Sequence, residues 1–513
     1  MKSLIVSMAL WPNRNLHFQR HKVWQLGALL LLLGQLLNPL SASAANYIDK
    51  EVAPESELSV LVKPLLHTLN SGDRQRILAF AKRHFSTSFM PAGSEVEIVN
   101  YLMSLYYGYG PLRFHGFRHY QPAFPDELLV VVYSELTESW QMIGLVNDGT
   151  QRDKIGNFLL APARWPSNVP APAALDEASA VAKLNRFAER LAQDEHFSGT
   201  LLLAKGDKVL INRSFGLANK ASEIKNNTET RFDLASITKV FTGVAVTQLI
   251  QANKLRPTDT LDLYLDQSWL PSEISKTIQI QHLLTHTSGL AGYDDALRQA
   301  NKAQLVRLQD YRPLLNIDST LFEPGSQQMY SNTGMFLLGA VIEKITGQDY
   351  HDYIQAHIFD VADMKNSGFL ERNQPYKHVA VGYERDDSKK TGWFDNSRVF
   401  GLRGTPDGGA YATTADMHKF TLALASHKLL DLAHTRLALS PKPELQAPTY
   451  GFGVNILGEG KTHRIGHEGG HYGVSTAFNW YPEPNYTLVV LSNISQGALG
   501  LENKARELIE RIE

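Results

Sequence analysis

The sequence predicts an α+β fold in which one antiparallel sheet packs against helices, with a smaller α+β part preceding it. Three observations predict this class. A Pro-rich stretch separates two differently patterned parts of the 513-residue chain. Near both ends of the second part, short apolar runs alternate with turn residues, as antiparallel strands do. Between those runs, apolar residues recur at helical spacing, so the sheet is expected to enclose a helical middle. The strand-like runs span 200–204, 209–215, 474–480 and 487–493.

The composition is that of an ordinary globular chain, long enough for two hydrophobic cores. Hydrophobic residues make up 43% and charged residues 20% of it, and 50 Lys and Arg against 52 Asp and Glu leave a net charge of −2. This balance predicts no nucleic-acid partner, because phosphate backbones are bound by an excess of positive charge. The absence of cysteine excludes a cysteine nucleophile. Since the sequence has no His-Glu-x-x-His motif, we expect no metal site.

The first 45 residues are expected to be a Sec-type signal peptide. Arg20 and Lys22 precede an apolar run at 23–37, and a small-residue stretch follows at 41–46. Positive, apolar and Ala-x-Ala regions in this order are typical of a cleaved export signal. An uncleaved membrane anchor is the alternative, but the apolar run is shorter than the roughly 20 residues that span a bilayer. We therefore expect an exported protein, periplasmic or extracellular, that is free of the membrane after cleavage.

A first domain is expected at 46–163, ahead of a linker at 164–174 that carries several prolines. A helical segment at 57–85 precedes four strand-like runs. Helices followed by a curled antiparallel sheet make this part weakly similar to the nuclear-transport-factor-2-like (NTF2-like) group. We expect it to be a structural or substrate-shaping appendage to the second domain, 175–513. The four runs are 112–120, 128–136, 140–147 and 155–160.

The clearest chemical motif is Ser236 with Lys239, at the start of an apolar helix. Ile237, Val240 and Val244 follow helical spacing, so the helix begins at or just before Ser236. Residues three apart share a helix face, and a helix N-terminus favours a developing anion. Burial lowers the pKa of a lysine amine, which then becomes a base able to take a hydroxyl proton. We therefore expect Ser236 as the nucleophile and Lys239 as its base.

The Ser-x-x-Lys pattern is frequent, and Ser222 with Lys225 matches it as well. That second copy lies among polar residues and no apolar helix follows it. We therefore expect it in a solvated loop without a chemical role.

A second stretch has Tyr330 two residues before Asn332, between a turn at Pro324 and Gly325 and an apolar helix. Loops held between rigid elements often carry catalytic groups. A phenol beside a lysine ammonium can have its pKa lowered and relay a proton, and an Asn amide can orient both lysine and substrate. A tyrosine and an asparagine that merely cap the next helix are the alternative.

A Gly-rich stretch around His467 is the third candidate. Gly469 and Gly470 follow this histidine, and glycines let a ligand approach the backbone closely. The backbone N–H of Gly470 can join that of Ser236 in an oxyanion hole. We expect His467, Gly469 and Gly470, together with Asn332, to bind substrate. A loop between strands without chemistry is the alternative.

These three motifs, in this order, resemble the serine β-lactamase-related family. They are Ser236-x-x-Lys239, Tyr330-x-Asn332, and His467-x-Gly469 in place of the family's Lys-Thr-Gly. The resemblance covers about residues 175–513 and includes class C β-lactamases, penicillin-binding proteins, D-Ala-D-Ala carboxypeptidases and esterases. It implies a β-lactamase/transpeptidase-like antiparallel sheet with helices on both faces. It also implies acyl transfer at Ser236, with Tyr330 and Lys239 moving the proton and no cofactor.

Glu468 is the one clear departure from the family, which usually has Thr, Ser or a small residue where a substrate carboxylate is held. A carboxylate at that position repels such a substrate. The favoured function is therefore a serine hydrolase of a small ester, amide or peptide. A cell-wall D-Ala-D-Ala carboxypeptidase or β-lactamase is one alternative, and a non-catalytic penicillin-binding-like sensor is another. We expect His282 and His286 to be structural and Thr413 to cap a helix.

Overall fold

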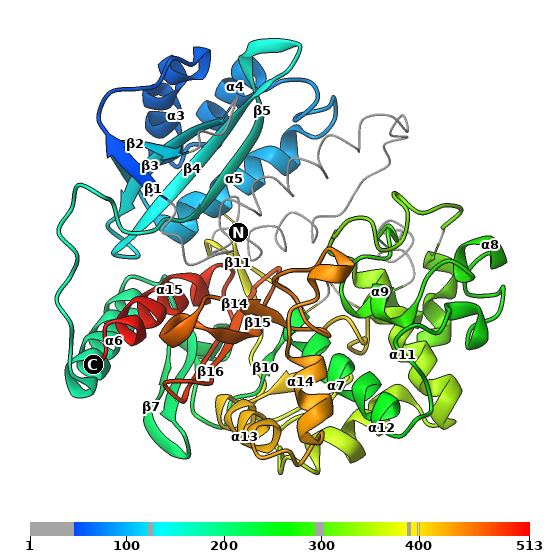
Figure 1. Ribbon diagram of the computed structural model, residues 1–513. Helices are drawn as coiled ribbons and strands as arrows, with labels where there is room; N and C mark the ends of the chain where they lie inside the picture. The colour runs from blue at the N-terminus through cyan, green and yellow to red at the C-terminus, as the bar shows by residue number, and fades with distance from the viewer. Residues whose placement is uncertain are drawn as a thin grey trace. The chain divides into compact units, whose positions relative to one another are not determined.

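The computed structural model divides into two compact units, one formed by residues 46–191 with 499–513 and the other by 192–498 (Figure 1). The expected signal peptide, 1–45, lies outside the described residues. Among the helices that are described, none combines the length and the apolar character needed to cross a bilayer. The described residues are 46–121, 127–292, 302–315, 317–386, 391–397, 399 and 401–513.

The first unit holds a five-stranded antiparallel sheet in which each strand pairs with its neighbours in sequence. Helices precede four of the five strands, as expected, whereas the first strand, which the sequence did not predict, comes before them. Asp73 caps α4 by accepting from the backbone N–H groups of Gln75 and Arg76. The likeness to the NTF2-like group stays a prediction. The elements are β1 (Asn46–Lys50), η1 (Glu57–Leu61), α3 (Val62–Asn70), α4 (Arg74–His84), α5 (Glu95–Tyr109), β2 (Leu112–Gln121), β3 (Glu127–Ser134), β4 (Ser139–Asp148), β5 (Gln151–Pro162) and all but two residues each of α6 (Glu177–Gln193) and α15 (Gly497–Glu510).

The segment expected as a linker is bonded to this first unit at its beginning. Arg118 and Asp49 form a fully buried ion pair, with Nε 2.9 Å from Oδ1. The same carboxylate accepts from the backbone N–H of Ser167 at 2.7 Å, and Tyr47 donates to the carbonyl of Trp165. A buried charge is stable only when paired and hydrogen-bonded, so these contacts fix the segment's course. The domain boundary at 164–174 stays a prediction.

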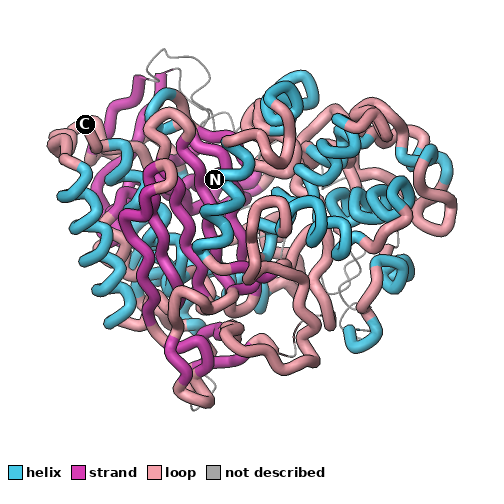
Figure 2. The backbone as a smooth tube through the Cα atoms, turned by 90° about the horizontal axis from the view of Figure 1, so that it is seen from below, coloured by secondary structure: helices cyan, strands magenta, loops and turns pink. Residues whose placement is uncertain are grey.

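The second unit contains a six-stranded antiparallel sheet in the order β14-β15-β16-β17-β6-β7. Strands from its two ends meet where β17 pairs with β6, from Tyr486 opposite Lys205 to Ser492 opposite Gly199. This confirms the expected sheet built from distant parts of the chain, and with it the α+β class (Figure 2). The strands are β6 (Gly199–Lys205), β7 (Lys208–Phe215), β14 (Asn455–Leu457), β15 (Arg464–His471), β16 (Val474–Tyr481) and β17 (Tyr486–Ser492).

Short strand pairs and bridging helices complete this unit. The pairs are β8 (Leu217–Asn219) with β9 (Ile224–Lys225), β10 (Phe232–Asp233) with β13 (Tyr411–Ala412), and β11 (Tyr383–Arg385) with β12 (Trp393–Asp395). Thr413 caps α13 by accepting from the N–H of Asp416, as expected. The helices are η2 (Ala235–Ile237), α7 (Thr238–Gln251), η3 (Leu261–Leu263), α8 (Ser272–Ser275), α9 (Ile280–Leu284), η4 (Lys302–Gln304), η5 (Leu308–Leu314), α11 (Asn332–Thr346), α12 (Tyr350–Ile354), η6 (Gln355–Phe359), α13 (Thr414–Ala425), α14 (Leu432–Ala438), η7 (Pro443–Leu445) and η8 (Gly460–Thr462).

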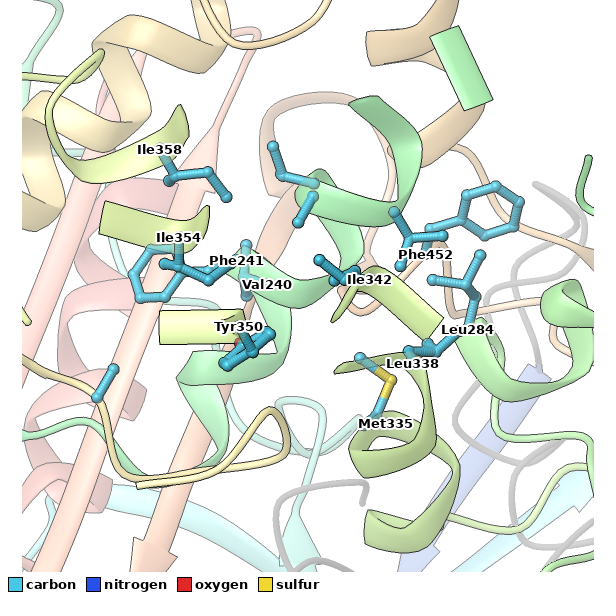
Figure 3. Packing of buried hydrophobic residues seen from close by; sticks show 14 of the residues in the cluster. Val240, Phe241, Leu284, Met335, Leu338, Ile342, Tyr350, Ile354, Ile358 and Phe452 are labelled. Atoms are coloured by element: carbon cyan, nitrogen blue, oxygen red, sulfur yellow. The ribbon is translucent and has the colours of Figure 1, made fainter. Parts of the chain in front are cut away.

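The hydrophobic core of this unit surrounds α7, the helix that follows Ser236. Phe241 on α7 makes edge-to-face contacts with Phe359 and Phe420, both at 5.0 Å between ring centroids. Figure 3 shows residues of α7, α9, α11 and α12 packed together in this cluster. Because α7 is buried over most of its length, its first turn is held rigidly, and the candidate nucleophile lies directly before that turn.

Candidate active site

Ser236 lies at the point where η2 passes into α7, and it is almost completely buried. Its Oγ lies 3.0 Å from Nζ of Lys239 and accepts a hydrogen bond of 2.8 Å from the phenol of Tyr330. The Nζ atom of Lys239 is also 4.9 Å from the centre of the Tyr330 ring. The structure thus brings together the three residues that the sequence predicts for the chemistry, although Tyr330 is 94 residues away from Ser236.

Lys239 is fully buried, and its surroundings are those of a base. Burial lowers the pKa of Lys239 to about 7, and the nearby Asp407 carboxylate only partly opposes this shift. Its Nζ also donates a hydrogen bond to the carbonyl oxygen of Asp407. At neutral pH a large fraction of the amine is therefore unprotonated and can accept the hydroxyl proton of Ser236.

Tyr330 is buried as well, and the expected lowering of its pKa is wrong. Burial raises the pKa of Tyr330, the hydrogen bond to Ser236 lowers it in part, and the carboxylates of Asp407 and Glu468 raise it further. The phenol therefore stays protonated at neutral pH. It can pass on a proton only as a hydroxyl that donates and accepts at the same time.

Asn332 begins α11, directly after the cap formed by Ser331, whose Oγ accepts from the N–H of Gly334 at 3.1 Å. Ser331 therefore caps α11, and neither Tyr330 nor Asn332 does so. The Oδ1 atom of Asn332 is buried and, within the described part of the chain, has no hydrogen-bond partner. A buried acceptor without a donor is costly, so a ligand N–H at this position would be favourable.

Strand β15 carries the third motif and packs against η2. A side chain at Gly469 would lie 2.3 Å from the carbonyl oxygen of Leu234, so only glycine fits there. At Gly470 an added Cβ would have only one neighbour, the Val474 carbonyl at 3.7 Å, which leaves room for a ligand. Packing therefore explains Gly469, while the role of Gly470 as an oxyanion-hole donor stays a prediction.

His467 points from β15 toward Tyr330, with ring centroids 6.3 Å apart, and is almost fully buried. The next residue, Glu468, is partly exposed and its Oε2 accepts from the amide of Asn455 at 2.8 Å. The carboxylate also contributes to the raised pKa of both Tyr330 and Tyr450, after burial. The negative charge of Glu468 is thus close enough to act electrostatically on Tyr330, whose hydroxyl donates to Ser236.

Ser222 and Lys225, the second copy of the Ser-x-x-Lys pattern, are exposed on the loop and short strand after β8. This is the solvated position that the sequence predicts. The prediction rested on the absence of an apolar helix after the motif.

Asp233 is a residue of this site that sequence reasoning missed. Its Oδ1 accepts from the N–H of Ala235 at 2.8 Å, and its Oδ2 lies 2.8 Å from Arg372 and 3.4 Å from Nε2 of His471. Ala235 has φ of +46°, an unusual conformation for a residue with a side chain, directly before Ser236. Asp233 therefore holds the backbone directly before Ser236 in place. The signal available in the sequence was its position two residues before the Ala-Ser pair.

Metal binding has no support in the described residues, since they contain no cluster of three or more His, Asp or Glu side chains suited to hold an ion. The candidate site instead consists of a serine, a lysine of lowered pKa and a neutral phenol. This set has the composition expected of a serine-nucleophile acyl-transfer site in which a lysine serves as the base.

The comparison with known proteins agrees with this class. The sequence model of the family described as Beta-lactamase matches residues 184–510, and the chain belongs to that family of serine hydrolases. Penicillin-binding protein 4* of Bacillus subtilis is 32% identical over 327 residues, which cover 60% of this chain and 71% of that protein.

Solved structures show the same fold. A penicillin-binding protein from Bacillus halodurans matches with a TM-score of 0.56 and 32% identity, over 62% of this chain and 98% of that one. The D-amino acid amidase of Ochrobactrum anthropi matches with a TM-score of 0.55 over 65% of this chain and 98% of that chain. At 20% identity, this second likeness concerns the fold alone.

Proposed function

We propose that the protein hydrolyses small esters or amides through an acyl-enzyme on Ser236, with Lys239 and Tyr330 as the proton relay. The observation that carries the proposal is the position of Ser236 Oγ, at 3.0 Å from the Lys239 amine and 2.8 Å from the Tyr330 hydroxyl. A weak nucleophile needs an adjacent base, and this arrangement supplies one whose pKa is matched to neutral pH.

The reaction would proceed in two steps. Lys239 takes the Ser236 proton as Oγ forms a bond to the substrate carbonyl carbon, and the N–H groups of Ser236 and Gly470 stabilise the oxyanion. The C–O or C–N bond of the leaving group then breaks, and the leaving group takes up the proton through Tyr330. Water attacks the acyl-enzyme in the same way, giving up one proton to the relay and releasing the acid and free Ser236.

Two acceptors favour a substrate that carries hydrogen-bond donors and lacks a carboxylate near the reacting carbonyl. They are the buried Oδ1 of Asn332, which has no donor within the described chain, and the partly exposed carboxylate of Glu468. An amide N–H or an ammonium group satisfies these acceptors, whereas a carboxylate is repelled. We propose further that residues 1–45 direct export, so that the substrate is met outside the cytoplasm.

The first experiment compares wild-type protein with Ser236→Ala, using a fluorophosphonate probe and hydrolysis of p-nitrophenyl acetate. We expect the wild type to be labelled covalently and Ser236→Ala to lose both labelling and hydrolysis. A wild-type protein that neither labels nor hydrolyses would overturn the hydrolase proposal and leave a non-catalytic sensor. Labelling of Ser222 instead would show that Ser236 is wrongly assigned as the nucleophile. Peptide mass spectrometry of the labelled protein distinguishes the two serines.

Glu468→Thr tests the substrate preference. Because this change removes a negative charge beside the site, we expect acylation by a fluorescent penicillin, which carries a carboxylate, to become at least about tenfold faster than in the wild type. The exposed Glu483→Thr serves as the matched control and should leave the rate unchanged. If the wild type already reacts with penicillin as fast as Glu468→Thr, the alternative function as a D-Ala-D-Ala carboxypeptidase or β-lactamase is favoured.

A further inference from the structure

His286 makes backbone and side-chain contacts on both sides of Tyr330. Its carbonyl accepts from the N–H of Met329 at 2.8 Å, and its Nδ1 accepts from the N–H of Ser331 at 3.2 Å. Its ring packs on the Tyr330 ring, with centroids 4.4 Å apart. His286 itself is buried and has φ of +60°, a strained conformation for histidine. Strain of this kind persists only where the surroundings demand it, often at functional sites.

The other ring nitrogen of His286 continues toward strand β15. Nε2 lies 3.0 Å from the hydroxyl of Tyr450, and that hydroxyl lies 3.2 Å from Nε2 of His467. At the far end, Nδ1 of His467 lies 2.5 Å from the carbonyl oxygen of Glu468. All three side chains are buried, with 2%, 2% and 1% of the surface of His286, Tyr450 and His467 exposed. The hydrogen bonds therefore persist without competition from water.

The chemistry of the two ends fixes the direction of this chain. A backbone N–H only donates, so Nδ1 of His286 must accept, and the proton of its neutral ring is on Nε2. A carbonyl only accepts, so Nδ1 of His467 must donate, and in the neutral ring Nε2 then carries the lone pair. Tyr450 can satisfy both rings at once, since its oxygen accepts from His286 and its O–H donates to His467. The two histidines thus take opposite tautomers.

We propose that His286 and Tyr450 are positioning residues, which hold Tyr330 and His467 in place beside Ser236 through this directional chain. The proposal rests on the proposed function, because it concerns how the residues of that site are kept in order. Tyr330 is held on both sides of its backbone and across its ring, and His467 is held by Tyr450. Since the Nε2 lone pair of His467 already accepts from Tyr450, proton transfer is left to Lys239 and Tyr330.

Asn and Gln variants of His286 separate its two contacts. In His286→Asn the side-chain oxygen can replace Nδ1 and accept from Ser331, while the bond to Tyr450 is lost; Asn also tolerates positive φ. In His286→Gln the amide can reach Tyr450, while the acceptor for Ser331 is lost. We expect kcat/KM for p-nitrophenyl acetate to fall about 100-fold in His286→Gln, because Tyr330 is displaced. We expect a loss of about tenfold in His286→Asn and in Tyr450→Phe.

A double variant tests whether the two residues act through one chain. His286→Asn combined with Tyr450→Phe should lose no more than either change alone, because both remove the same link. Tyr353→Phe, which removes a buried hydroxyl bonded to Gln248 at 3.2 Å, is the matched control and should retain wild-type kinetics. Wild-type kinetics in His286→Gln, or losses that multiply in the double variant, would overturn the proposal. If His286→Gln does not fold, the pair of milder variants decides.

Nitrogen-15 spectra of histidine-labelled protein test the tautomers independently of activity. We expect His286 to carry its proton on Nε2 and His467 on Nδ1, with the two signals assigned from His286→Asn and His467→Asn. In Tyr450→Phe the proton of His467 should stay on Nδ1, held by the Glu468 carbonyl, while the Nε2 signal shifts because it loses the donor hydroxyl. A His467 ring protonated on Nε2 in the wild type would overturn the chain. The tautomers test the positioning proposal, whereas the fluorophosphonate probe tests the proposed function. The failure of one is therefore distinguished from the failure of the other.

Discussion

Lys239→Met is expected to lower kcat/KM by about 10³-fold or more, because a positioned general base contributes about 10²–10⁴-fold to a proton-transfer step. Methionine fills nearly the same volume but cannot take the Ser236 proton. The variant should also lose fluorophosphonate labelling. The rate of hydrolysis of p-nitrophenyl acetate measures the effect, and Lys442→Met is the matched control. Lys442 is another buried lysine, whose amine donates to the carbonyls of Leu437 and Ser440.

The wild-type pH profile follows from the same lysine. Only the unprotonated amine acts as a base, and burial lowers the pKa of Lys239 to about 7. Activity should therefore rise with pH and level off above pH 7, and below it should fall by about tenfold per pH unit. A profile that is flat between about pH 5 and pH 8, or one whose midpoint is unchanged in Lys239→Met, would contradict Lys239 as the base.

Stability distinguishes loss of the base from loss of the fold. Because the pKa of Lys239 is lower in the folded than in the unfolded state, the unfolded chain binds more protons between pH 7 and about pH 10. Wild-type stability should therefore gain from rising pH in this range, whereas Lys239→Met lacks this contribution. We expect the variant to melt no lower than the wild type at pH 7. A group that costs stability yet is kept is typical of a functional site.

Local patterns explain which parts of the fold the sequence predicts. The strands β6, β7, β16 and β17 carry clear apolar runs ended by turn residues, so their existence follows from short-range signals. Helix α5 was missed because buried residues lie on nearly all of its faces, which leaves no one-sided apolar stripe. Strand β1 was missed because it is short and carries Asp49, whose burial depends on Arg118, a partner 69 residues away.

The same division holds for the candidate site. Ser236, Lys239 and Tyr330 are recognisable because their residue types and spacing already carry the chemistry. Tyr450 and His286 are not recognisable in this way. The Tyr450 hydroxyl gains its role only because the fold brings it to His286, 164 residues away, and to His467, 17 residues away. The pKa of Tyr330 was misjudged for a related reason. The sequence suggests the neighbouring lysine charge but not the burial that outweighs it.

Asp233→Asn is expected to reduce the free energy of unfolding by about 3 kcal/mol, because it removes the counter-charge of the largely buried Arg372. Asparagine keeps Oδ1 as an acceptor for the N–H of Ala235, so the change tests the charge and not the turn. Urea unfolding at pH 7 measures the effect. Asp431→Asn is the control, since Asp431 pairs with His434 at an exposed helix start and such pairs contribute less than about 1 kcal/mol.

The pH dependence of this difference gives a second test of the charge. Burial raises the pKa of Asp233, but His471 and Arg372, together with the Ala235 N–H, outweigh it and hold the pKa below its ordinary value. A carboxylate whose pKa is depressed by folding stabilises the protein fully above the unfolded value of about 4, and this contribution is lost as the pH falls further. The deficit of Asp233→Asn should therefore be constant above about pH 5 and shrink in more acidic solution.

Activity should fall together with stability, because Asp233 joins the turn before Ser236 to the end of β15. His471, its partner on that strand, directly follows Gly470. Losing the charge weakens the link of Asp233 to His471 and so frees the end of β15, which supplies the proposed oxyanion-hole N–H of Gly470, and displacing one such donor costs about 10²–10³-fold in kcat. Arg372→Met added to Asp233→Asn should restore part of the stability, since no charge is then left unpaired, but not the activity. Full recovery of both would mean that Asp233 serves the fold alone.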